Sequence, residues 1–267
     1  MTTLQTSKTT HDELVAALNS LIAEGRLLPR EDLRLKRIER DASKLMKVDA
    51  CLGWVTMGDL CSLAGAADEM DACFENAQKI RQDEILYEHW AASRLNLGQV
   101  LAAQRLLVDR YSPRRGHFTS KIHLLNGAGA FHLLHQGYEE AVAIGIDMDV
   151  HRADADRTAA IVRLLDEAGL TDDDVGRAIG IAVSAVARRG FFVQGAPIIS
   201  VADEPGVFRG VTFLLQTSLS GDAFLDLAKD IVRSEDADPK LRKHPLFEVG
   251  ILPSVGDSLI SSGPEMQ

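Results

Sequence analysis

Three features that define common protein classes are scarce in this chain of 267 residues. It has only three cysteines, Cys51, Cys61 and Cys73, and their odd number and spacing fit neither a disulfide scaffold nor a common zinc motif. Aromatic residues make up 5%, and the longest apolar run, residues 178–187, is far shorter than the roughly 20 residues of a membrane-spanning helix. These absences predict a soluble protein whose cysteines are small buried side chains kept reduced.

A basic region is also missing. The formal net charge is −10, and neither side of Val150 carries a basic excess, which works against a main role in binding a phosphate backbone. No apolar segment follows a basic start at the N-terminus, so we expect no targeting signal, no membrane association and a cytoplasmic location. No phosphate-binding glycine loop, nucleophile elbow or dinucleotide fingerprint occurs, and no cofactor is expected.

The first half of the chain has a helical pattern. Leu14, Leu18 and Leu21 recur at helical spacing, and Gly25 ends the segment, which predicts a helix over residues 11–24. A charged segment with its own apolar stripe predicts a second helix over residues 34–47. A repeat follows at an offset of 33 residues, and it pairs Trp54 with Tyr87, Gly58 with Ala91, Gly65 with Gly98, Met70 with Ala103, and Phe74 with Leu107.

A period of this length with small residues at crossing points is typical of stacked helical hairpins. Residues 51–147 resemble tetratricopeptide repeats, although Cys61 stands at the family's usual tyrosine and Met70 at a usual small residue. We expect a third, divergent pair over residues 120–146, with Gly137 to Ala141 at its turn and second-helix start. A non-repetitive helical bundle is the alternative.

The resemblance implies a groove on the first helix of each pair. It would bind another protein or peptide through mostly apolar positions: Leu52, Val55, Asp59, Ser62, Ile85, Glu88, Ala92 and Leu95. Such a groove either holds an amphipathic helix of a partner or is filled by the chain's own N-terminal helix.

Beyond Val150 the pattern changes. Helices are expected over residues 159–168 and 173–189, with Thr171 as an N-cap. Strands over residues 197–202, 207–219 and 246–252, with a turn at 204–206 and a helix over 223–233, predict an antiparallel sheet with helices. The predicted fold is mainly α: a helical-hairpin domain (11–150), a small α+β domain (151–253) and a flexible tail (254–267).

Residues 171–189 allow a different function. Gly176, Gly180 and Val186 have helix-turn-helix spacing, which would place Ser184, Arg188 and Arg189 against DNA, as in a transcriptional regulator. A single alanine-rich helix is the structural alternative, and the three aspartates at the start of this segment, Asp172 to Asp174, work against DNA binding.

A metal-dependent enzyme is the third possibility. It rests on His132 and His135, which have the i, i+3 spacing of possible metal ligands, but surface or hydrogen-bonded histidines explain this spacing more simply. The first hypothesis is therefore a non-enzymatic adaptor, chaperone or assembly protein that binds a partner segment, with nucleic acid as the less favoured partner.

Overall fold

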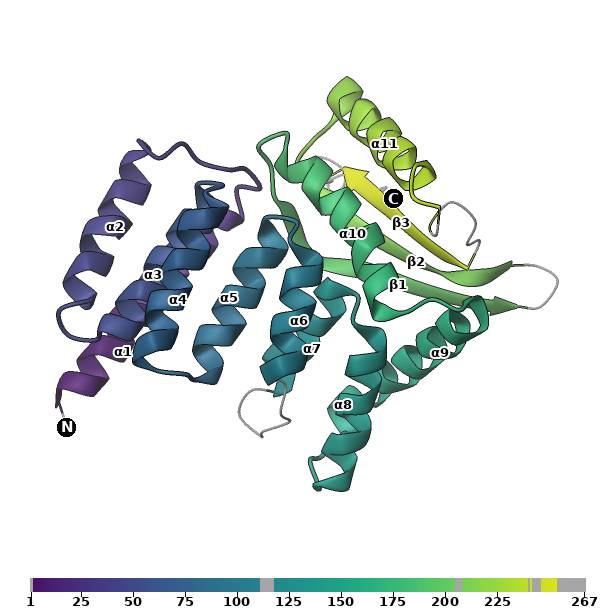
Figure 1. Cartoon of the computed structure of the whole chain (residues 1–267), viewed down its shortest axis with the longest axis horizontal. Coiled ribbons are helices and arrows are strands. Elements are labelled where there is room, and N and C mark those ends of the chain that lie inside the picture. The colour runs from purple at the N-terminus through teal and green to yellow at the C-terminus, as the bar shows by residue number, and fades with distance from the viewer. Residues whose placement is uncertain (1, 111–117, 205–207, 240, 242–245, 254–267) are drawn as a thin grey trace, which may run out of the picture.

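The computed structural model describes residues 2–110, 118–204, 208–239, 241 and 246–253. Helices dominate it, and a small sheet lies toward the C-terminus (Figure 1). In chain order, the elements are α1 (Thr2–Ile22), α2 (Leu33–Leu45), α3 (Ala50–Leu63), α4 (Ala67–Ile80), α5 (Glu84–Asn96), α6 (Val100–Arg110), α7 (Phe118–Ala128), α8 (Phe131–Ala143), a short 3-10 helix (Asp149–His151), α9 (Arg152–Ala168), α10 (Asp172–Ala187), β1 (Val193–Glu204), β2 (Phe208–Thr217), α11 (Gly221–Asp236) and β3 (Phe247–Pro253).

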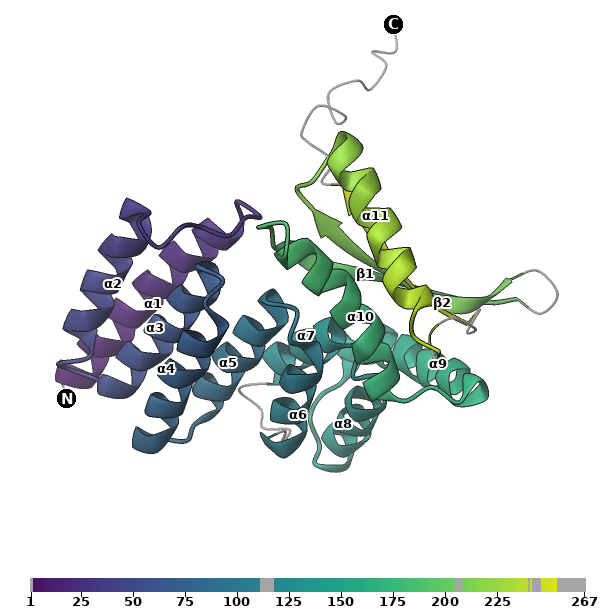
Figure 2. The same cartoon turned by 45° about the horizontal axis from the view of Figure 1, so that its top comes forward.

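Helices α1 to α8 form an array in which neighbours in sequence lie side by side (Figures 1 and 2). The pairs α3/α4, α5/α6 and α7/α8 are helical hairpins, and each turn contains a glycine with positive φ: Gly65 at 71°, Gly98 at 75° and Gly129 at 66°. Left-handed backbone is costly for residues with a Cβ atom, so these glycines end one helix and let the next fold back. The predicted helical array is confirmed.

The residues paired by the 33-residue offset occupy equivalent places. Met70 and Ala103 are both fully buried. Phe74 is fully buried as well, and its counterpart Leu107 is 5% exposed. The third hairpin differs from the prediction, because its turn lies at Gly129, whereas Gly137 to Ala141 lie inside α8. Gly137 is a buried residue inside α8 and does not form the predicted turn.

The sheet has the order β1-β2-β3 and is mixed. β1 and β2 pair antiparallel, as expected for a hairpin, but β2 and β3 pair parallel, with Val211 opposite Phe247 and Phe213 opposite Val249. The expectation of an antiparallel sheet was therefore wrong for β3. The reason is that α11 carries the chain back to the start of β2 before β3 begins, which makes a parallel crossover. Of the predicted turn at residues 204–206, positions 205 and 206 lie outside the described residues, as does the tail at 254–267.

One face of the sheet supplies much of the core. Val211, Phe213 and Leu215 share this face, as predicted, and are at most 3% exposed. Helices α10 and α11 lie over the sheet (Figure 2), and Phe131 of α8 packs edge-on against Phe213 with ring centroids 6.4 Å apart. The same hydrophobic cluster contains residues on both sides of Val150, so the hairpins α5/α6 and α7/α8 share a core with the sheet.

The loop after α1 closes the array against the start of β1. The amide of Leu27 donates to the Gly190 carbonyl at 2.8 Å, and the amide of Phe192 donates to the Gly25 carbonyl at 2.9 Å. Phe192 is fully buried in the cluster formed by α1, α2 and α3. These contacts join segments more than 160 residues apart in the sequence. No helix in the described part of the chain is long and apolar enough to cross a membrane.

Aspartate and threonine side chains cap the N-termini of several helices. Asp49 and Asp83 accept hydrogen bonds from the amides of Leu52 and Leu86, each at 3.0 Å. Thr171 caps α10 as predicted: its hydroxyl accepts from the Asp174 amide, and the Asp174 carboxylate accepts from the Thr171 amide. Such reciprocal caps satisfy amides that have no partner within the helix.

The capping role of Thr171 gives a test of this part of the fold. We expect Thr171→Ala to lower the free energy of unfolding by about 1 kcal/mol, because the Asp174 amide loses its acceptor. Urea denaturation followed by circular dichroism measures the change. Ser220→Ala is the matched control, since Ser220 precedes α11 without a side-chain capping bond to the described residues. Equal losses in the two variants would contradict a capping role for Thr171.

Candidate functional site

The candidate site is a concave hollow formed by the first helices of the hairpins together with α1 and β1. It consists of two cavities of about 470 and 390 Å³. Four residues line both cavities, namely Ala92 and Asn96 of α5 and His123 and Leu124 of α7. The two cavities therefore adjoin each other, and we call them together the concave groove.

The larger cavity is the apolar end of the groove. Its wall combines helix residues with the sheet edge, and its apolar members include Leu95, Ile122, Val183, Ile199 and Leu215. In β1, the pairing with β2 shifts register between Gln194 and Ile198, and the irregular segment 195–197 lines the cavity. A bulge bends a strand locally and interrupts its ladder, so β1 presents side chains here instead of a regular edge.

The smaller cavity is the polar end, and α1 forms one of its walls through Val15, Leu18, Asn19 and Ile22. Opposite α1, His89 Nδ1 lies 2.7 Å from Asp59 Oδ2. The Ser93 hydroxyl donates to Asp59 Oδ1 at 3.0 Å.

Asp59 and His89 form a close pair at the polar end, which Glu88 also lines. Burial opposes protonation of His89, but the adjacent Asp59 carboxylate outweighs it and raises the pKa of His89 above its usual value.

Three asparagine side chains line the groove without a hydrogen bond to any described residue. Asn19 belongs to α1, Asn96 to the junction of the two cavities, and Asn126 to the apolar end. Each side-chain amide can both donate and accept hydrogen bonds. The groove can therefore satisfy polar groups of a ligand next to apolar surface.

The structure places the predicted groove residues in two sets. Asp59, Ser62, Glu88 and Ala92 line the polar end, and Ala92 and Leu95 line the apolar end. By contrast, Leu52 and Val55 are 7% and 1% exposed and belong to the core, and Ile85 lines neither cavity.

Val55 is buried in the cluster that α3 forms with α4 and α5, whereas Leu52 is buried by α1. Leu14, Leu18 and Leu21 of α1 pack in the same cluster as Leu52 and Leu60 of α3. The N-terminal helix thus covers Leu52 and Leu60 of the first hairpin, whereas Asp59 and Ser62 of the same hairpin still line the polar end. The contributions of α7 and β1 to the groove are not predicted by the sequence pattern. For α7 the reason is that the predicted turn of the third hairpin lies at Gly137 to Ala141 instead of Gly129. Gly129 follows Gly98 by 31 residues, and this spacing was the signal that could have placed the turn correctly.

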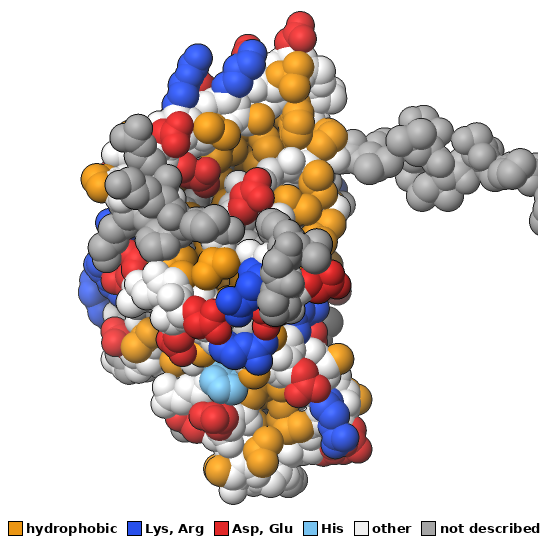
Figure 3. All heavy atoms as spheres, turned by 90° about the vertical axis from the view of Figure 1, so that its right-hand side faces the viewer, with side chains coloured by type: hydrophobic (Ala, Val, Ile, Leu, Met, Phe, Trp, Pro, Cys, Tyr) orange, Lys and Arg blue, Asp and Glu red, His pale blue; other side chains and the backbone are white. Residues whose placement is uncertain are grey.

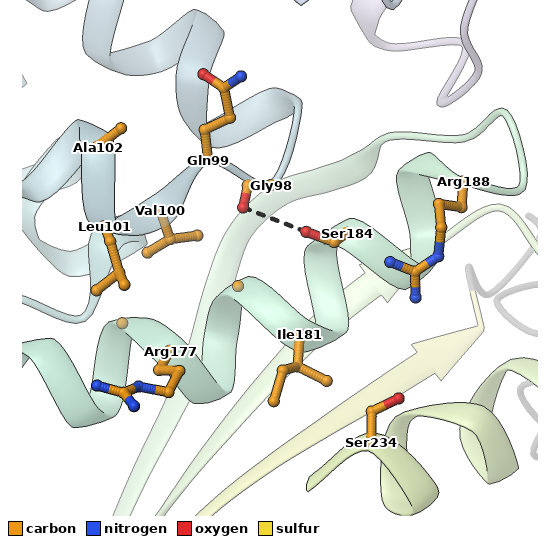
Figure 4. A pocket seen from close by; sticks show the side chains of 12 residues that line it. Gly98, Gln99, Val100, Leu101, Ala102, Arg177, Ile181, Ser184, Arg188 and Ser234 are labelled. Carbon is orange, nitrogen blue, oxygen red and sulfur yellow. Dashed lines mark hydrogen bonds between the residues drawn. The ribbon is translucent and has the colours of Figure 1, made fainter. Parts of the chain in front are cut away.

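A second hollow of about 380 Å³ lies between the start of α6 and the outer side of α10. Figure 4 shows Arg177 and Arg188 toward opposite ends of this stretch of α10, with Ile181 between them. The Ser184 hydroxyl donates to the Gly98 carbonyl at 3.3 Å, which fixes α10 against the turn between α5 and α6.

The helix-turn-helix prediction for residues 171–189 is wrong in its geometry. Residues 172–187 form the single helix α10; Gly176 lies so close to Gln104 that an added Cβ would clash, and Gly180 lies inside the helix beside Gly98 and Val100. Gly180 therefore does not make the turn that a helix-turn-helix needs. Of the proposed DNA-contacting residues, Ser184 binds Gly98, Arg189 pairs with Asp230, and Arg188 lines the second hollow.

On the face of the molecule shown in Figure 3, lysine and arginine side chains do not form a continuous stripe. Seen from the right-hand side of Figure 1, acidic and basic side chains are intermixed, and hydrophobic side chains gather in the upper part of the view (Figure 3). Several ion pairs of the described residues are local along one helix, such as Arg157 with Asp154 at 2.7 Å.

His132 and His135 do not share a ligand site. His132 Nδ1 lies 2.8 Å from Asp172 Oδ1, and the hydrogen bond to Asp172 raises the pKa of His132 to about 8 despite partial burial. Asp172 also accepts from the backbone amides of His132 and Leu133, so it caps α8. His135 instead lies near Glu139, at 3.7 Å. Within the described residues, no group of three or more His, Cys, Asp or Glu side chains is arranged to hold a metal ion.

Comparisons with known proteins add no assignment. No family model, curated protein or solved structure matches the chain.

Proposed function

We propose that this chain is a protein-binding module, tetratricopeptide-like in its hairpin arrangement, which holds an amphipathic helical segment of another protein in the concave groove. The observation that carries the proposal is the open groove itself: a cavity of about 470 Å³ with an apolar wall, continuous with a polar end. Cavities of this size and polarity are typical of ligand sites.

The chain's own α1 supports a helix as the occupant. Leu14, Leu18 and Leu21 lie at positions i, i+4 and i+7 and are all at most 8% exposed against α3. The array thus already accepts one amphipathic helix, and the open groove continues from α1 along α5 and α7. A partner helix with apolar side chains at helical spacing would extend this packing.

The groove also favours a partner of low net charge. Asp59 is paired with His89, and Asp154 at the apolar end is paired with Arg157 at 2.7 Å. The free amides of Asn96 and Asn126 suit uncharged polar groups at the border of the apolar surface. Binding energy would come mainly from burying one or two large apolar side chains of the partner.

Selection from a displayed library of random 16-residue peptides on the full chain tests the proposal. We expect the selected peptides to carry apolar residues at i, i+3 or i+4, and i+7. Leu95→Asp and Leu124→Asp should each weaken their binding by at least about tenfold, because a carboxylate would be buried against the partner's apolar face. Titration by fluorescence anisotropy measures the affinities.

The matched control is Leu33→Asp, since Leu33 is 84% exposed on α2 and lies outside the groove. It should leave binding unchanged, and circular dichroism should confirm that all three variants are folded. Unchanged binding in both groove variants, or no peptide enriched above an unrelated protein, would refute the proposed function. Selected peptides with apolar residues at every second position would refute the helical occupant.

A further inference from the structure

The second hollow, between the start of α6 and the outer side of α10, differs in charge from the rest of the chain. Its lining includes two arginines, Arg177 and Arg188, and no acidic residue, although the chain as a whole carries a net charge of −10. Ile181 lies between the two arginines (Figure 4), and Leu101 of α6 also lines the hollow. The hollow thus has an apolar centre with a positive charge toward each end.

The two arginines are available to a ligand. Arg188 is exposed, and its side chain makes no ion pair or hydrogen bond with another described residue. Arg177 has only a long contact, with Nη1 3.8 Å from Asp238 Oδ2. The neighbouring Arg189, by contrast, is bound to Asp230. The positive charge of the hollow is therefore only weakly compensated by the part of the chain that the structure describes.

The C-terminal segment, residues 254–267, has a composition complementary to this hollow. It lies outside the described residues. It contains two acidic residues, Asp257 and Glu265, and no lysine, arginine or histidine. Leu259 and Ile260 stand between the two acids. The order acid, apolar pair, acid in the segment therefore matches the order arginine, apolar centre, arginine in the hollow.

The register of the sheet shows where this segment leaves the described chain. Pro253, the last residue of β3, lies opposite Thr217 of β2, and Thr217 lies opposite Val193 of β1. Val193 follows Arg188 by only five residues. Because neighbouring strands are about 4.8 Å apart, Pro253 lies about 10 Å from Val193. The segment thus begins at the end of the sheet that adjoins the Arg188 end of α10.

The lengths of the segment and of the hollow agree. Asp257 is four residues beyond Pro253 and can reach about 14 Å from it. The two arginines are eleven residues apart on α10, a rise of about 16 Å. The eight-residue step from Asp257 to Glu265 can span up to about 27 Å. The segment is therefore long enough to run along the hollow from the nearer arginine to the farther one.

We propose that the hollow on α10 is a docking site for the chain's own C-terminal segment, residues 254–267. Asp257 pairs with Arg188 and Glu265 with Arg177, and the apolar residues between the two acids cover the apolar centre of the hollow. The inference does not depend on the proposed binding function.

Covalent attachment favours this occupant over a separate partner of the same chemistry. Exposed ion pairs are individually weak and are screened by salt. A short tether, however, keeps the segment at an effective concentration in the millimolar range, so that a few weak contacts are enough to hold it. A free partner has to overcome this advantage.

The opposite face of the sheet is also close to the start of the segment. It carries Leu214 of β2 and, opposite it on β1, Ile198, which is 45% exposed. The described strand residues that share this face with Leu214 include no lysine or arginine. That face therefore offers no partner for the two acidic side chains, whereas the hollow offers one for each.

A photoreactive side chain in the segment tests the docking in the full chain. With p-benzoylphenylalanine in place of Leu259, irradiation of the dilute protein and peptide mapping should give intramolecular cross-links to α10 or to the start of α6. Arg188→Glu should lower their yield at least about fivefold, and Arg188→Glu combined with Asp257→Arg should restore most of it, because the two charges are exchanged. Raised salt should lower the yield in the protein with both original charges.

The matched control is Arg37→Glu, which makes the same change of charge at an exposed position of α2 and should leave the cross-links unchanged. Circular dichroism checks that the variants are folded, and the probe at Ile260 serves as a second position. Cross-links confined to the sheet or the concave groove, cross-links only between molecules, or none from either position would overturn the proposal. So would equal losses in Arg188→Glu and Arg37→Glu, or no recovery in the exchanged pair.

Discussion

Replacing Phe74 by alanine is expected to lower the free energy of unfolding by about 3–5 kcal/mol. Phe74 is fully buried in α4, and its ring stacks on Trp90 of α5 with centroids 5.7 Å apart. Gly58 of α3 faces the same ring so closely that an added Cβ would clash with it. One side chain thus holds three helices of adjacent hairpins, and its removal leaves a cavity that the neighbouring backbones cannot fill.

Urea denaturation measures this effect. Because domains of this kind are stable by only about 5–15 kcal/mol, the loss would be a large part of the total. Leu33→Ala, at a position 84% exposed, should change stability by no more than about 0.5 kcal/mol. A loss below about 1 kcal/mol for Phe74→Ala would show that the hairpins do not depend on this contact.

Acidification is expected to loosen α1 from the array, through His11. The His11 side chain is buried between α1, α3 and α5, with its ring centroid 5.4 Å from that of His89. His11 Nδ1 lies 3.1 Å from the Thr56 hydroxyl, and that hydroxyl donates its only proton to the Leu52 carbonyl. His11 must therefore donate from Nδ1, and the neutral ring already makes the bond that the site offers.

Protonation of His11 is unfavourable in the docked state. Burial and the nearby His89 lower the pKa of His11, although Asp59, Asp12 and Asp49 act in the opposite direction. Because its pKa is lower when α1 is docked, the docked state binds fewer protons than the detached state. Docking is therefore favoured above the usual histidine pKa of about 6.5 and weakens as the pH falls below it.

The pairing of His89 with Asp59 acts differently. Its raised pKa stabilises the fold at low pH, and this contribution is lost as the pH rises through the folded-state value. Both residues lie outside α1, on α5 and α3, so the pair can persist when α1 detaches. The pH dependence of α1 docking is thus assigned to His11.

Hydrogen exchange of the α1 amides at several pH values, corrected for intrinsic exchange, measures docking. We expect protection to fall several-fold between about pH 7 and pH 5. In His11→Asn, which keeps a donor near the Nδ1 position, this dependence should largely disappear. His135→Asn, on α8, should retain the wild-type response. A pH response that survives in His11→Asn would contradict the assignment.

Local structure followed closely from the sequence. The apolar period of Leu14, Leu18 and Leu21 predicted α1, and the paired glycines Gly65 and Gly98 predicted two hairpin turns. Thr171 marked the start of α10. These predictions succeeded because helix periodicity, capping and left-handed turns depend on neighbours within a few residues.

The candidate site was less predictable. Asp59, Ser62, Glu88, Ala92 and Leu95 were predicted and do line the groove, because their helix faces follow from the repeat register. The wall formed by β1, the junction at His123 and Leu124, and the covering of the first hairpin by α1 were not predicted. Each depends on contacts between segments far apart in the chain.

The sequence by itself determined that most of the chain is helical, that hairpins turn at Gly65 and Gly98, and which helix faces are apolar, since these properties repeat within one or two helical turns. Only the tertiary structure decided that α1 packs on α3, that β3 runs parallel to β2, and that the groove stays open beside β1. The physical reason is that an apolar stripe specifies burial without specifying its partner, and the partner is selected by the packing of the whole chain.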